Sequence, residues 1–135
     1  MSYVQPAFDG TEIAAAAPSK SRRRVDDYEA WVDEVWPAFV AAADTGQPFT
    51  VDAIARDNNL PDPPSPKAQW GSLPGRLLDA GIIRHHGYGQ SARCRRSLVY
   101  TWIGVPAHRR EAVARRRREE RKAAREARQQ GRAAA

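Results

Sequence analysis

Apolar side chains spaced three and four residues apart are the feature that most constrains how this 135-residue chain folds. Between Val25 and Gly46 they recur with the period of an α-helix, and the acids lie mostly on the opposite face. Asp26 or Asp27 is expected to cap the start of this helix, and Gly46 is expected to end it. Pro37 lies inside and predicts either a kink or the start of a second helix. The apolar positions are Tyr28, Trp31, Val32, Val35, Trp36, Phe39 and Val40.

Two shorter helical segments follow, with a proline-rich stretch between them. Thr50 is a good N-cap for the first, and Asn58 and Asn59, which tolerate left-handed backbone geometry, are expected to close it. The connector "PDPPSP" favours extended geometry. Ser65 and Pro66 are typical of the start of the next helix. Its apolar positions are Trp70, Leu73, Leu77 and Leu78; Pro74 and Gly75 predict an irregular turn in its middle, and Gly81 ends it.

Two runs rich in β-branched and aromatic residues come next, "IIRHH" and "LVYTWIG". Gly87, Gly89 and Ser91 supply turn chemistry between them, which predicts a β-hairpin with a long loop. We interpret all four tryptophans of the chain as core side chains. They are Trp31, Trp36, Trp70 and Trp102.

The order of these elements resembles that of the winged helix-turn-helix family from Val25 to Gly104. The segments "FTVDAIARDNNLPDPP", "WGSLPGRLLDAGIIRHHGY" and "YTWIG" are more narrowly similar to small winged-helix proteins of bacteriophages of actinobacteria. The resemblance implies an α+β, mainly α fold, with three helices around one core and a hairpin whose loop projects as a wing. We expect this domain over residues 25–106, a disordered tail over 1–24, and a basic helical or disordered tail over 107–135.

Charge is divided unequally along the chain. Residues 84–135 hold 15 of the 22 basic side chains but 4 of the 16 acids, in a protein of net charge +6. Such segregation indicates a polyanionic partner for the C-terminal half. Arginine outnumbers lysine 19 to 3, for which a GC-rich genome is an alternative reason.

The resemblance also implies that the third helix enters the major groove of DNA, where exposed side chains reach bases and phosphates. Gln69 suits adenine, whereas Lys67 and Arg76 suit phosphate or guanine. A merely solvated face is the alternative for this helix. The exposed positions of the helix are expected to be Lys67, Gln69, Ser72 and Arg76.

The loop of the hairpin is the firmer candidate, because no acid neutralises its cations. Gly87 and Gly89 would let the backbone approach a phosphate, and Tyr88 would stack or simply pack. Such a loop can lie along the DNA backbone or enter the minor groove. Its cationic donors are Arg84, Arg93, Arg95 and Arg96, with His85 and His86 beside them.

The arginines of the C-terminal tail fall around a whole helical circumference, so they are expected to add salt-sensitive affinity without sequence preference. A solvated tail is the alternative. The first six of them are Arg109, Arg110, Arg115, Arg116, Arg117 and Arg118, and Arg121, Arg125, Arg128 and Arg132 follow.

Other functions find little support in the sequence. The single cysteine, Cys94, excludes an intrachain disulfide and lacks the partners of a catalytic thiol. His85, His86, Cys94 and His108 match no zinc-finger spacing, and no run of 18 apolar residues predicts a membrane span. We expect no catalytic residue, cofactor, metal or membrane, and a cytoplasmic location in a bacterial host.

We therefore expect a non-enzymatic protein that binds double-stranded DNA and acts in transcription control, replication or genome handling. One alternative is a docking module that binds a host or phage protein through its acidic first helix. Another is RNA binding by the basic tail. The oligomeric state is left open. The acids of the first helix are Asp26, Asp27, Glu29, Asp33 and Glu34.

Overall fold

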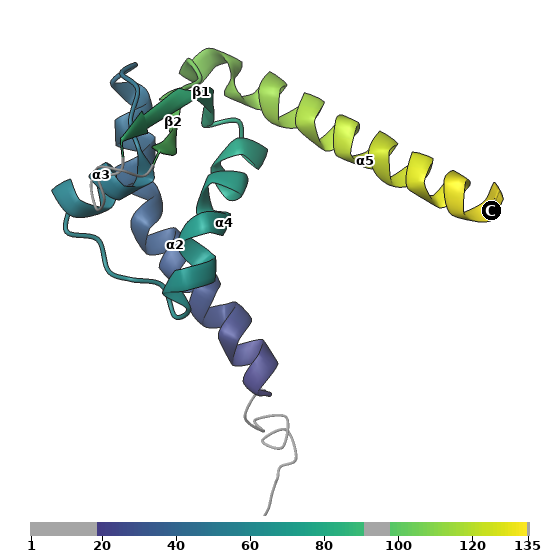
Figure 1. Ribbon diagram of the computed structural model, residues 1–135, viewed down its shortest axis with the longest axis horizontal. Helices are drawn as coiled ribbons and strands as arrows, with labels where there is room; N and C mark the ends of the chain where they lie inside the picture. Colours follow the sequence, from purple (N-terminus) through teal and green to yellow (C-terminus); the bar gives the residue numbers. More distant parts are fainter. Residues whose placement is uncertain (1–18, 91–97, 135) are drawn as a thin grey trace, which may run out of the picture.

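The computed structural model describes residues 19–90 and 98–134, and it has an α+β fold that is mainly helical. Among the described residues, three helices come first, and an antiparallel hairpin follows them (Figure 1). No helix within these described ranges is long and apolar enough to cross a membrane. The three helices are α2 (Lys20–Asp44), α3 (Val51–Asp57) and α4 (Pro66–Asp79), and the hairpin consists of β1 (Ile83–Gln90) and β2 (Leu98–Gly104).

Helix α2 begins earlier than its apolar pattern does. Its first residue is Lys20, and the hydroxyl of Ser19 accepts a hydrogen bond of 3.1 Å from the amide of Arg22. The predicted start at Val25 and the predicted cap at Asp26 or Asp27 are therefore wrong. The first turn carries basic side chains and buries none of them, so no apolar periodicity marks it.

The two internal prolines do not divide their helices. Helix α2 runs through Pro37 and α4 runs through Pro74, so Pro37 does not begin a second helix. Each proline lacks one backbone donor, while the hydrogen bonds of the turns on either side hold the helix together.

The caps of α3 and the start of α4 agree with the sequence. The Thr50 hydroxyl accepts a hydrogen bond from the amide of Ala53 at 3.2 Å, and Asn59 adopts a left-handed φ of 50° after α3. Ser65 precedes Pro66 at the start of α4, as predicted. The Ser65 hydroxyl makes no capping bond; instead its amide donates to the side chain of Gln69 at 2.7 Å.

The hairpin is antiparallel and contains one irregularity. Tyr88 lies opposite Tyr100 and His85 lies opposite Trp102, with a register shift between His85 and Gly87. Phe49, in the link between α2 and α3, forms a bridge with Trp102 through hydrogen bonds of 2.9 and 2.8 Å. This bridge fixes the base of the hairpin against the helices.

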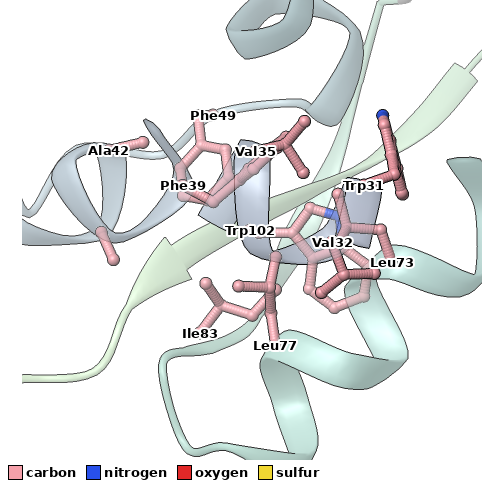
Figure 2. Close-up of a cluster of buried hydrophobic side chains, with 11 residues drawn as sticks. Trp31, Val32, Val35, Phe39, Ala42, Phe49, Leu73, Leu77, Ile83 and Trp102 are labelled. Carbon is pink, nitrogen blue, oxygen red and sulfur yellow. The ribbon is translucent and has the colours of Figure 1, made fainter. Parts of the chain in front are cut away.

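The core lies where α2, α4 and the hairpin meet (Figure 2). Burial of side chains of this size contributes roughly 1.5–3 kcal/mol each. Of the tryptophans interpreted as core, Trp31 and Trp102 are buried, while Trp36 and Trp70 are partly buried against the same cluster. The largest fully buried side chains are Val35, Phe39, Leu73, Leu77 and Ile83.

A short 3-10 helix, η1 (Ala107–Arg109), leads into α5 (Arg110–Ala134), whose far end projects away from the other helices (Figure 1). The first turns of α5 belong to the packed body. Ala114 is buried, and the backbone of Arg110 lies so close to Gly81 that a side chain there would overlap it. The Arg110 guanidinium donates to the carbonyl of Val105 and to the carboxylate of Asp44, each at 2.8 Å.

Candidate nucleic-acid interface

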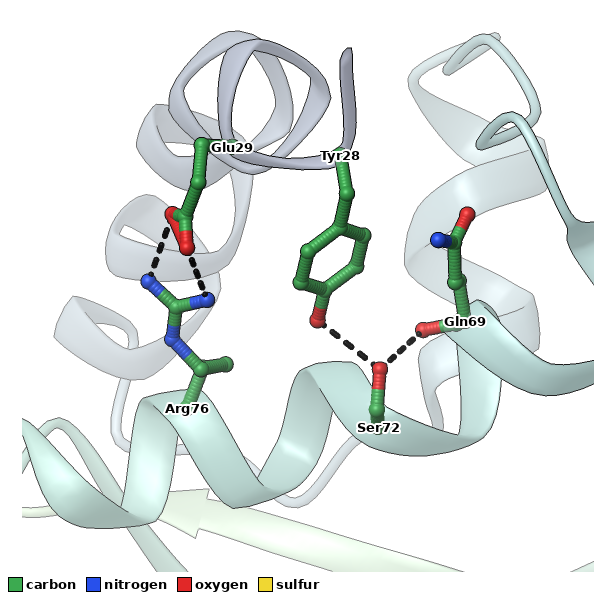
Figure 3. Close-up of polar contacts among 5 residues, drawn as sticks. All are labelled: Tyr28, Glu29, Gln69, Ser72 and Arg76. Carbon is green, nitrogen blue, oxygen red and sulfur yellow. Dashed lines mark hydrogen bonds and ion pairs between the residues drawn. The ribbon is translucent and has the colours of Figure 1, made fainter. Parts of the chain in front are cut away.

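Two of the four side chains predicted to be presented by α4 face α2 instead (Figure 3). Ser72 donates to the carbonyl of Gln69 at 2.9 Å and shares a 2.8 Å hydrogen bond with the hydroxyl of Tyr28. Arg76 forms two hydrogen bonds with the carboxylate of Glu29, at 2.8 and 2.9 Å. Both contacts join α4 to α2, so they serve the helix packing.

The ion pair between Arg76 and Glu29 has the geometry of a strong one. The hydrogen bond from Arg76 lowers the pKa of Glu29, and the hydrogen bond to Glu29 raises the pKa of Arg76. The guanidinium carbon also lies 5.8 Å from the centre of the Tyr28 ring. Because a planar guanidinium matched to a carboxylate leaves few donors for a further partner, Arg76 is poorly placed to read a base.

The other two positions of α4 lie near its start. The Gln69 side chain is half-buried and accepts the hydrogen bond from the Ser65 amide, so its oxygen is occupied. Lys67 is exposed, and it has no ion pair with any residue that the structure describes. It lines a shallow pocket between α3 and α4 together with Arg56 and Asp62. Lys67 is therefore the one predicted α4 cation that is open to a phosphate in the described part of the chain.

Of the four arginines predicted on the wing, Arg84 falls within the described residues. It is exposed on β1 and lines a hollow shared with Val113 and Arg116 of α5. Arg93, Arg95 and Arg96 lie in segment 91–97, outside the described residues. Arg84 thus brings one cation of the hairpin next to the cations of α5.

The predicted arginines of the C-terminal segment have different surroundings. Arg109 and Arg115 are exposed and have no ion pair within the described ranges. Arg116 and Arg118 form loose pairs with Glu120 at 3.6 Å and with Glu111 at 3.7 Å. Pairs this exposed are worth little and are readily exchanged for phosphate. Arg110 and Arg117, by contrast, anchor α5 to the body.

Asp79 at the end of α4 is the main anchor of α5. Arg117 donates to its Oδ1 at 2.6 Å and Arg121 donates to its Oδ2 at 2.5 Å. Burial by itself raises the pKa of Asp79, but the hydrogen bonds from the two arginines outweigh it and hold the pKa below its ordinary value. The carboxylate therefore stays ionised at neutral pH and joins α5 to the end of α4.

Beyond Arg121, α5 carries exposed cations without described ion-pair partners. Its ten basic and four acidic side chains give a net charge of +6, which equals the net charge of the whole chain. All other residues together are neutral. Arg125, Arg128 and Arg132 continue, at helical spacing, the face on which Arg117 and Arg121 contact Asp79. This stripe of arginines points to the side of α5 on which the body lies.

An aromatic face of the hairpin was missed as a site from the sequence. His85, Tyr88 and Tyr100 are exposed, and their ring centres lie between 4.8 and 5.7 Å apart. A largely apolar groove adjoins Tyr100, between β2, α3 and α4. For β2, the sequence did hold a signal: Tyr100 and the buried Trp102 are two residues apart, which places both rings on the same face of the strand. The place of Tyr88 on the same face depends on the register shift.

Comparisons with known proteins add no relative: no family model, curated protein or solved structure matches the chain.

Proposed function

We propose that this protein is a winged-helix DNA-binding protein that binds duplex DNA mainly through phosphate contacts from α5 and the hairpin. Three helices followed by a hairpin, with the Phe49–Trp102 bridge at its base, support the winged-helix part of the proposal. A small protein of this kind, of the phage type, would act in transcription control, replication or genome handling.

The observation that carries the proposal is that α5 has a net charge of +6, equal to that of the whole chain, and that its exposed turns beyond Arg121 hold four cations and one acid. The 13 residues from Lys122 to Ala134 span about 20 Å, at about 1.5 Å per residue. A duplex of that length carries on the order of ten phosphates. The basic side chains there are Lys122, Arg125, Arg128 and Arg132, and their binding would release counterions.

Sequence readout by α4 has weaker support. Ser72, Arg76 and the oxygen of Gln69 are engaged inside the protein, which leaves Lys67 as the available cation. Contacts to phosphates position a protein on DNA but carry no sequence information. We therefore propose binding with little preference for sequence.

A variant in which Lys122, Arg125, Arg128 and Arg132 are all replaced by glutamine tests the proposal. Binding to a random-sequence duplex is measured by fluorescence anisotropy between about 50 and 200 mM salt. The full chain should bind, with affinity that falls steeply as salt rises. The variant should bind more weakly, and the slope of log K against log salt should decrease by about 3.6, since each of the four lost phosphate contacts removes about 0.9.

The matched control replaces the same number of exposed cations at the other end of the fold, Lys20, Arg22, Arg23 and Arg24. Its net charge equals that of the first variant, so a general effect of charge would lower the slope equally in both. Equal slopes in the two variants would contradict a role for α5 in particular. Absence of duplex binding by the full chain at low salt would refute the function.

Protein docking is the second candidate, and one observation favours it. Asp27, Asp33 and Glu34 are exposed on α2 without an ion pair to any described residue, so this face suits a basic partner. A full chain that binds no duplex but retains a basic protein through these acids would support this candidate instead.

A further inference from the structure

Most of the large apolar side chains that are exposed among the described residues lie on the hairpin. Four such side chains are exposed in all, and three of them, Tyr88, Leu98 and Tyr100, belong to β1 or β2, with 67%, 72% and 52% of their surface accessible. The fourth, Val25, lies apart on α2. Because clusters of exposed apolar side chains on a protein surface commonly mark interaction sites, this face is a candidate for ligand binding.

The rings contact one another in a series that leads outward from the core. Trp102 is buried at the base of the hairpin, and Tyr100 contacts it with ring centres 5.8 Å apart. His85 contacts Tyr88, Tyr100 and Trp102 edge to face, at 5.7, 4.8 and 5.7 Å. Tyr88 lies directly opposite Tyr100 in the ladder, with ring centres 5.2 Å apart. The rings therefore form a continuous aromatic face that becomes more exposed with distance from the core.

The positive charge of this region indicates which kind of ligand with flat apolar surfaces would bind there. No aspartate or glutamate occurs in the stretch that runs from Ala80 through Arg110, whereas that stretch holds six arginines and three histidines. An apolar surface of a partner protein would bind the rings without this excess of basic residues. A ligand that combines flat rings with negative charge is a nucleic acid whose bases are unpaired, since duplex bases hide their faces in the stack.

We propose that the hairpin face formed by His85, Tyr88 and Tyr100 is a stacking platform for unpaired bases. The inference rests on the proposed nucleic-acid binding and extends it: α5 would hold phosphates of any nucleic acid, and the platform would add affinity for single-stranded segments. Stacking on an aromatic ring tolerates every base, because each base has a π-face, so this added affinity would also show little sequence preference.

The test compares a thymidine strand of about 12 nucleotides, an abasic strand of equal length and a random duplex, each bound to the full chain. A variant with Tyr88→Leu and Tyr100→Leu keeps apolar side chains at these exposed positions but removes the rings. It should bind the thymidine strand about tenfold or more weakly, which is the loss expected for one stacked base. Binding to the abasic strand and to the duplex should be unchanged.

A variant with Tyr88→Phe and Tyr100→Phe is the matched control. It keeps the rings but removes the hydroxyls, whose mutual hydrogen bond raises the pKa of Tyr88. It should bind the thymidine strand as the natural chain does. Urea unfolding midpoints that match among the three proteins establish that the fold is kept.

The possible results separate the platform from the proposed function. If the leucine variant binds the thymidine strand as tightly as the natural chain does, the platform is refuted, and duplex binding through α5 stands. If the leucine variant loses duplex and strand equally, the rings do not recognise unpaired bases and the inference is again wrong. If the natural chain binds neither the duplex nor the thymidine strand, the proposed function is refuted, and the platform is refuted with it. A uridine strand distinguishes RNA from DNA as the source of the bases.

Discussion

At the scale of single residues, two glycines have the same backbone conformation in different surroundings. Gly46 and Gly81 have φ values of +73° and +74°, in the left-handed region that side chains disfavour. An added Cβ at Gly46 meets nothing within 4 Å, whereas at Gly81 it would overlap the backbone of Arg110. Gly81 therefore serves both the turn after α4 and the close approach of α5.

This pair predicts two different losses of stability. Gly46→Ala should lower the free energy of unfolding by about 1 kcal/mol, from backbone strain alone. Gly81→Ala should lower it by roughly a further 1–3 kcal/mol, because rigid backbone must move to admit the methyl group. Urea denaturation of the two variants measures both values. Gly71→Ala, in open space within α4, is the control and should not destabilise.

If Gly81→Ala costs no more than Gly46→Ala, α5 does not lie against this turn in solution. That result would remove the geometric basis for a fixed α5, while leaving its charge intact.

At the scale of elements, local signals marked the starts of α3 and α4, whereas the start of α2 and the contacts between elements were not readable from the sequence. Thr50 and Ser65 marked the starts of α3 and α4, because a helix start depends on neighbours in sequence. Arg76 was expected to be available to DNA, yet its partner Glu29 lies 47 positions away, on α2. No spacing within α4 reveals such a partner.

The hairpin shows the same limit within one element. Simple alternation places His85 and Tyr88 on opposite faces of a strand, because they are an odd number of residues apart. The register shift between His85 and Gly87 reverses that parity, so the two rings meet. The hairpin was predictable from β-branched and aromatic residues, but Gly87 and Gly89, predicted as turn residues, lie in β1, and the aromatic face required the register.

The contact between α4 and α5 makes a prediction about pH. Because the folded pKa of Asp79 lies below its ordinary value, its ionised form stabilises the fold above about pH 4, and this contribution is lost as the pH falls through the folded pKa. Asp79→Asn should lower the free energy of unfolding at neutral pH by about 1 kcal/mol or less, since 36% of the side chain is exposed. The difference from the natural chain should be smaller at about pH 2 than at neutral pH.

Urea titrations at the two pH values measure this difference. Asp57→Asn, which breaks a more exposed pair with the adjacent Arg56, is the control and should have a smaller effect at neutral pH. An Asp79→Asn variant that is as stable as the natural chain at neutral pH would show that the anchor of α5 lies elsewhere.

At the scale of the whole molecule, α5 consists of a first part that packs on the body and a second part that is exposed and cationic. The turns from Arg110 to Arg121 contact the body through a buried alanine and the two arginines on Asp79. The turns beyond are exposed through Ala133 and carry four cations that have no ion pair with a described residue. The sequence predicted a basic segment after residue 106, but its packed first half has too few large apolar residues to show an apolar face.

Two truncations separate these halves of α5. A chain that ends at Ala124 keeps every described contact of α5 with the body, so its free energy of unfolding should match that of the full chain. It loses Arg125, Arg128 and Arg132, so the salt slope of duplex binding should fall by about 3.

A chain that ends at Pro106 uncovers Gly81 and leaves Asp79 without its arginines, so its free energy of unfolding should be lower by about 2 kcal/mol or more. Thermal unfolding and anisotropy on the same samples measure both. If the chain that ends at Pro106 is as stable as the full chain, α5 lies outside the folded unit. If the chain that ends at Ala124 binds duplex with an unchanged slope, the turns of α5 beyond Ala124 do not hold phosphates.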